Sequence, residues 1–66
     1  MTVYIVFEDE SRYGIDGVFL YKEKAIESAV EILRGQRINQ GKGEEELFVM
    51  ADEYFEEHEV TGAENN

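Results

Sequence analysis

The chain has 66 residues, and its 16 Asp and Glu against 6 Lys and Arg leave a formal net charge of -10. So short a chain buries only about 60% of the surface that it exposes when unfolded, which predicts a single domain of marginal stability. The acidic charge makes nucleic acid and anionic membranes poor partners. No apolar run approaches the roughly 18 residues that span a bilayer, so we expect a soluble, intracellular protein.

The sequence contains no cysteine, which excludes disulfides and thiolate metal sites as sources of stability and fits a reducing compartment. Self-association is the remaining common way to stabilise so small a core. A homodimer is therefore expected.

Two strands are expected in the first third. The β-branched and aromatic run at residues 3–7 stops at three consecutive acids, which is typical of a strand that enters a polar loop. Residues 15–20 predict a second strand that forms an antiparallel hairpin with the first.

The first predicted strand is apolar on both faces, because its side chains alternate and all five are apolar. We expect Val3, Ile5 and Phe7 to face the helices. Tyr4 and Val6 would then lie on the opposite face, which would also have to be buried.

From Lys22 the apolar period changes to that of an amphipathic helix, with a stop at Gly35. Glycines, Asn and Gln make residues 35–43 a loop. A second helix is expected over about residues 44–55, and a short closing strand over 57–61. The helical stripes are as follows: Ala25, Ile26, Ala29, Val30 and Leu33 in the first helix, and Leu47, Phe48, Ala51, Tyr54 and Phe55 in the second.

Together these elements predict an α+β fold of order ββααβ, in which two helices cover a small antiparallel sheet. Residues 1–61 form this single acidic domain, and residues 62–66 read as a flexible C-terminal tail.

Motifs for catalysis or cofactor binding are weak. The glycine-rich segment 35–43 fails as a phosphate loop, because five residues separate Gly35 from Gly41 where four are needed and Gly43 replaces the metal-binding hydroxyl residue. His58 is the only histidine, and one histidine without cysteine does not build a typical zinc site. We expect no enzyme activity, no cofactor and no metal.

The charge is concentrated in the last third of the chain. Residues 1–21 carry four acids and one base, residues 22–42 carry three acids and five bases, and residues 43–66 carry nine acids and no base. The corresponding charges are -3, +2 and -9, which sum to the total of -10. This unopposed acidity is the most informative feature of the sequence.

Solubility alone would explain acidic charge, but it does not require an arrangement that destabilises the fold. If the second helix continues far enough, Asp52 with Glu56 and Glu53 with Glu57 are like-charge pairs at i, i+4, each costing roughly 0.2 to 0.5 kcal/mol of helix stability. Interspersed lysines would provide solubility without that cost, yet no Lys or Arg follows Lys42.

Unopposed carboxylates on a rigid scaffold imitate the charge pattern of a nucleic-acid backbone. A DNA strand offers one phosphate about every 3.4 Å of axis, and one helical stripe of carboxylates is sparser than that. The acidic loop, the second helix and a twofold-related copy would together approach the density of DNA, which is a second reason to expect a dimer.

The sequence also resembles a class of small acidic phage early proteins. The resemblance lies in the opening strand that begins at Val3, in Gly17-Val-Phe followed by Lys-Glu-Lys-Ala, and in a closing Glu-His-Glu-Val. Within that class it is similar to a host-takeover type from Bacillus phage that inhibits the nucleoid protein HU by DNA mimicry. The resemblance implies a homodimer in the host bacterial cytoplasm, at the nucleoid, whose acidic face occupies the DNA-binding surface of HU.

The leading hypothesis is thus a DNA-mimic inhibitor of a basic host protein. The alternative is a phage adaptor that binds another host protein through an apolar sheet face at Tyr4 and Val6, with the charge serving only solubility. The partner-binding residues predicted for mimicry are carboxylates: Glu8, Asp9, Glu10, Glu44, Glu45, Glu46, Asp52, Glu53, Glu56 and Glu57.

Overall fold

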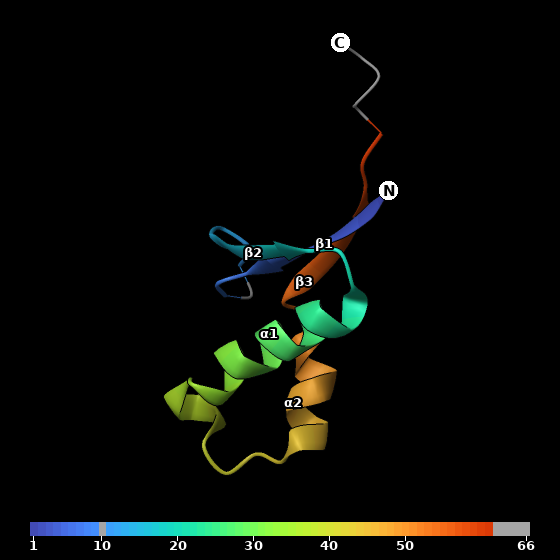
Figure 1. Cartoon of the computed structure of the whole chain (residues 1–66). Helices are drawn as coiled ribbons and strands as arrows, with labels where there is room; N and C mark the ends of the chain where they lie inside the picture. The colour runs from blue at the N-terminus through green and yellow to red at the C-terminus, as the bar shows by residue number, and fades with distance from the viewer. Residues whose placement is uncertain (10, 62–66) are drawn as a thin grey trace.

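The computed structural model describes residues 1–9 and 11–61, and both helices lie on one side of a three-stranded antiparallel sheet (Figure 1). The chain order is ββααβ, which confirms the predicted α+β fold. Glu10 and the predicted tail at 62–66 lie outside the described residues. The elements are β1 (Thr2–Phe7), β2 (Ile15–Phe19), α1 (Lys22–Arg34), a short 3-10 helix η1 (Arg37–Asn39), α2 (Glu44–Ala51) and β3 (Phe55–Glu59).

The strand order is β2-β1-β3, so the N-terminal strand lies between the other two. Val6 is paired with Gly17 on one side and with Phe55 on the other. Between Val6 and Phe7 the pairing with β2 shifts, which leaves Asp16 as the extra residue of a β-bulge.

The prediction of which face of β1 meets the helices was wrong. Val6 is completely buried in the core and Tyr4 packs against that core. By alternation, Val3, Ile5 and Phe7 therefore lie on the opposite face. Because both faces of this strand are apolar, its own sequence does not determine which face is buried. The neighbouring strand determines it: Phe55 pairs with Val6 and is buried on the helix side.

Helix α1 packs against all three strands. Its buried face is made of Ala25, Ala29, Val30 and Leu33, and the two alanines allow the helix backbone to approach the sheet closely. The helix ends at Arg34 as predicted, where the backbone N–H of Gly35 donates to the Glu31 carbonyl at 3.1 Å.

The connection at residues 35–43 is organised by a buried asparagine that the sequence pattern did not reveal. Asn39 Nδ2 donates to the Leu33 carbonyl and to Gln36 Oε1, both at 2.9 Å, and so satisfies a carbonyl at the C-terminus of α1. Gly41 has a φ of 91°, which favours glycine. The segment is a packed turn between α1 and α2.

Helix α2 is shorter than predicted, because it ends at Ala51 and the chain enters β3 at Phe55. The backbone N–H groups of Asp52, Glu53 and Tyr54 donate to carbonyls three residues earlier, at 3.3, 3.1 and 2.9 Å. This tight turn allows Phe55 to pair opposite Val6. The closing strand accordingly spans Phe55–Glu59, two residues earlier than the predicted 57–61.

None of the helices within the described residues is long and apolar enough to cross a membrane.

Replacement of Leu33 by alanine should lower the free energy of unfolding by about 2 to 5 kcal/mol, because the side chain is fully buried and its loss leaves a cavity. Urea unfolding followed by circular dichroism measures this. Ile38→Ala is the control: Ile38 is 82% exposed in η1, and its truncation should change stability by less than about 0.5 kcal/mol. Equal losses in both variants would contradict the described core.

Candidate functional site

The acids after β1 lie in the loop that leads to β2. The loop closes through the N–H of Glu8, which donates to the Gly14 carbonyl at 2.8 Å. Asp9 accepts hydrogen bonds from the hydroxyl and the backbone N–H of Ser11, the latter at 2.9 Å. The hydroxyl bond is the larger cause of the lowered pKa of Asp9, so this exposed carboxylate is held ionised.

Arg12 attaches this loop to the C-terminal third of the chain. Its Nη1 forms an ion pair with Glu56, and its Nη2 donates to the Glu53 carbonyl at 3.4 Å. Its guanidinium carbon lies 5.8 Å from the centroid of the Phe7 ring, within cation-π range. Arg12 has a φ of 65°, a left-handed conformation that costs a non-glycine residue of order 1 kcal/mol or more.

Arg12 therefore brings two acidic segments, distant in sequence, to the same end of the molecule. The loop acids Glu8 and Asp9 lie beside the turn that carries Glu53. The backbone also joins these segments, because the N–H of Phe7 donates to the Tyr54 carbonyl at 2.8 Å.

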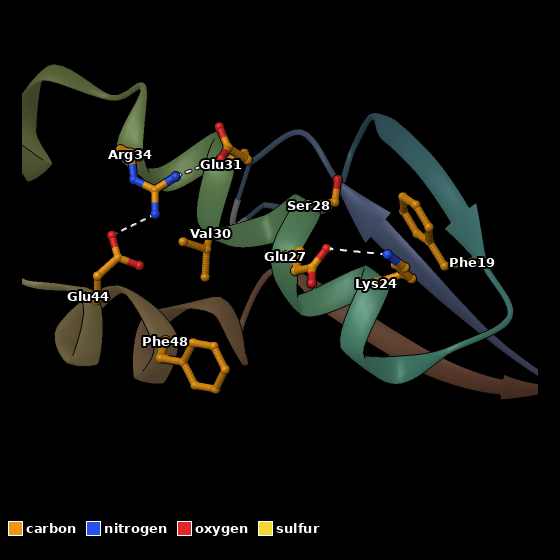
Figure 2. Close-up of a pocket in the computed structure, with 9 residues that line it drawn as sticks. All are labelled: Phe19, Lys24, Glu27, Ser28, Val30, Glu31, Arg34, Glu44 and Phe48. Carbon is orange, nitrogen blue, oxygen red and sulfur yellow. Dashed lines mark hydrogen bonds and ion pairs between the residues drawn. The ribbon is translucent and has the colours of Figure 1, made fainter.

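The three acids at the start of α2 have different partners. Glu44 forms an ion pair with Arg34 at 2.6 Å, and the same guanidinium bonds Glu31 at 2.6 Å (Figure 2). Glu44 is the main cause of the raised pKa of Arg34. Glu46 accepts a 3.4 Å hydrogen bond from the N–H of Gly43, just before the helix. Negative charge is favourable at this end of a helix.

The predicted like-charge pairs of Asp52 with Glu56 and of Glu53 with Glu57 are wrong, since α2 ends before all four residues. Asp52 and Glu53 lie in the turn, while Glu56 and Glu57 lie in β3. The inferred cost to helix stability therefore does not arise, and it no longer favours function over solubility.

Within β3, consecutive acids point to opposite faces of the sheet. Glu57 pairs opposite Tyr4 on the helix side, and Glu56 pairs opposite Ile5 on the open side. Glu56 Oε1 also lies 2.8 Å from His58 Nε2. The hydrogen bond with His58, followed by the hydrogen bond and the charge of Arg12, lowers the pKa of Glu56.

Glu59, which the sequence did not single out, is tied to the N-terminus. It accepts a 2.7 Å hydrogen bond from the Thr2 hydroxyl and lies 3.5 Å from the N-terminal amine. The Thr2 bond is the main cause of its lowered pKa. This carboxylate therefore fastens β3 to β1 at the far end of the sheet.

The predicted residues thus occupy separate groups: the hairpin loop with the turn before β3, the start of α2, and β3 itself. Within residues 1–9 and 11–61, Glu44 and Glu56 are the predicted acids that form ion pairs; Arg37 and Lys42 form none. In that described part of the chain, the predicted carboxylates without an ion pair are all exposed: Glu8, Asp9, Glu45, Glu46, Asp52, Glu53 and Glu57.

A groove of about 530 Å³ lies between α1 and α2, with Val30 and Phe48 among its walls (Figure 2). Its charged side chains already have partners: Arg34 bonds two carboxylates, and Lys24 lies 3.8 Å from Glu27. The charged side chains that line the groove are therefore all paired with one another. Among the described residues no three potential metal ligands are grouped together.

Comparisons with protein-family models, with curated proteins and with solved structures find no match for this chain. Function is therefore inferred from its own side chains.

Loss of the Glu56 carboxylate should destabilise the fold mainly at neutral pH. Its folded pKa is lowered from the ordinary 4.5, so its contribution is complete above 4.5 and is lost as the pH falls through the lower folded value. Glu56→Gln should therefore lower the midpoint of thermal unfolding at pH 7 and change it less near pH 3.

Glu57→Gln is the matched control, because it removes the same charge from the next residue, which forms no ion pair in the described chain. It should leave the midpoint at pH 7 unchanged or raise it slightly. If the two variants lose equal stability at pH 7, the bonds of Glu56 to Arg12 and His58 do not stabilise the fold.

Proposed function

We propose that the protein binds a basic, DNA-binding protein of the bacterial nucleoid, of the HU type, and occupies its DNA-binding surface as a DNA mimic. The observation that supports this most is that seven of the predicted partner-binding carboxylates are exposed and form no ion pair within residues 1–9 and 11–61, in a chain whose net charge is -10. Such a surface offers a strongly negative field to a partner whose own surface is shaped to hold phosphates.

The distribution of the cations adds to this support. Arg12, Lys24 and Arg34 are already paired with carboxylates of the same chain. The bases also lie before Gly43, whereas the second acidic segment begins at Glu44. The hairpin loop and the turn after α2 therefore remain acidic, the start of α2 keeps Glu45 and Glu46 without an ion pair among the described residues, and α1 carries a balanced surface.

Glu44 and Glu56 have a smaller role in this proposal than the other acids. Each would have to give up a bond to Arg34 or Arg12 before it could contact a partner. Glu45 and Glu46 begin α2 without that constraint, and Asp52 and Glu53 follow its end. We therefore assign the main contacts to the unpaired acids at both ends of α2.

The alternative is an adaptor that binds another host protein through an apolar sheet face, with the charge serving only solubility. The residues first assigned to it, Tyr4 and Val6, pack on the helix side. The face available to such a partner instead contains Val3, Ile5 and Val18. Added salt and charge-reversal variants distinguish the two functions, because neither should weaken binding through an apolar face.

Glu45→Lys should weaken binding to purified HU about tenfold, since it replaces an attractive contact with a repulsive one. Glu23→Lys is the matched control: it reverses a charge in the first turn of α1, where Lys22 and Lys24 flank it. It should change the affinity by less than about twofold. Isothermal titration calorimetry measures both, and equal effects would mean that net charge, rather than this surface, determines binding.

The complex with HU should weaken steeply as salt rises, because exposed charges are screened beyond about 8 to 10 Å at ordinary ionic strength. Duplex DNA should compete with the protein for HU in a fluorescence-polarisation assay. A complex whose affinity is the same at low and high salt, or one that binds HU and DNA together, would contradict DNA mimicry.

A further inference from the structure

The face of the sheet opposite the helices is apolar and, in the described part of the chain, bears no helix (Figure 1). The pairing register identifies the side chains on this open face, because directly opposed residues of antiparallel strands share a face. They come from all three strands: Val3, Ile5 and Phe7 from β1, Ile15 and Val18 from β2, and Glu56 and His58 from β3.

Much of this apolar surface meets water in a single chain. Ile15 and Val18 are 58% and 57% exposed, although they are the β-branched residues that strands usually bury. Phe7 is buried, with the guanidinium of Arg12 over its ring. A chain with such a small core gains from covering the rest.

The open face also carries little net charge. Its one carboxylate among the described residues, Glu56, is bonded to both Arg12 and His58. Asp16, in the bulge of β2, turns to the helix side, where it accepts a 3.3 Å hydrogen bond from Ser28 of α1. The local charge is thus close to zero, whereas the whole chain carries -10.

This charge distribution decides which partner fits. A basic protein is attracted to the acidic surfaces and gains no electrostatic attraction on a neutral one. A second copy of the chain is repelled by those same acidic surfaces, whereas the near-neutral open face offers it apolar contact without that repulsion. Identical patches can pair about a twofold axis, with the two sheets packed face to face.

We propose that the open face of the sheet is the interface with a second copy of this chain, so that the protein is a dimer with the two sheets inside and the helices outside. The acids at both ends of α2 remain exposed in this arrangement, because α2 lies on the other side of the sheet. The proposal does not depend on the function proposed above, because it concerns a different face and is tested with the chain alone.

Sedimentation equilibrium of the unmodified chain should show a dimer in the micromolar range, and Val18→Glu should make it a monomer. Val49→Glu is the matched control, since it makes the same substitution at a 76% exposed valine of α2, and it should leave the dimer intact. Far-UV circular dichroism verifies that each variant is folded.

Val18→Thr covers the case in which Val18→Glu fails to fold. Threonine keeps the β-branched shape and replaces one methyl group in each copy, so the dimer dissociation constant should rise about tenfold. Added salt should tighten the dimer, because it screens the repulsion between two acidic chains.

A chain that is monomeric at every concentration would overturn the proposal. The proposal would fail in the same way if the open face of that monomer bound a different protein. A folded Val18→Glu variant that still dimerises, an unchanged dissociation constant in Val18→Thr, or equal weakening by Val49→Glu would also overturn it. If Glu45→Lys loses HU binding but remains a dimer, the surface that binds HU and the dimer interface are different surfaces.

Discussion

Burial of β1 between two antiparallel partners is the constraint on which the rest of the structure depends. Val6 lies where the sheet meets the helical layer, opposite both Gly17 and Phe55. The register of β3 against β1 brings Glu59 opposite Thr2. The same register determines which carboxylates of the last third lie beside the hairpin loop and which lie beside the N-terminus.

The two sides of the sheet consequently have different physical characters. The helix side contains the core, with the exposed acids at the ends of α2 around it. The open side is apolar, and its one acid among the described residues is bonded to Arg12 and His58. The acidic surface proposed for a basic partner and the near-neutral surface proposed for a second copy therefore lie on different sides of a sheet in a chain of 66 residues.

Arg12 links the open face of the sheet to the turn before β3. Arg12 has a positive φ, and its guanidinium lies over Phe7 and beside Glu56, where it covers an aromatic ring and neutralises a carboxylate on the open face. The loop that carries Glu8 and Asp9 is held against the turn before β3 by the same contact. The strained backbone of one loop residue is offset by a cation-π contact, an ion pair and a hydrogen bond to the Glu53 carbonyl.

The sequence by itself determined the element order, the bounds of α1 and the acidity of the last third, because these follow from local periodicity, from glycine and from composition. It did not reveal Asn39 as the centre of the turn between the helices, since a single polar residue in a glycine-rich segment has no periodic signal. The end of α2 was also missed, because Tyr54 and Phe55 continue a helical stripe and leave the helix only through pairing with β1.

Tertiary structure alone decided which face of β1 is buried and which acids are neutralised. Val3 to Phe7 is apolar on both faces, so its orientation depends on Phe55, which is distant in sequence. Likewise, the partners of Glu44 and Glu56 lie 10 and 44 residues away along the chain. A local pattern can establish how much charge a segment carries, but only the folded chain places a cation beside it.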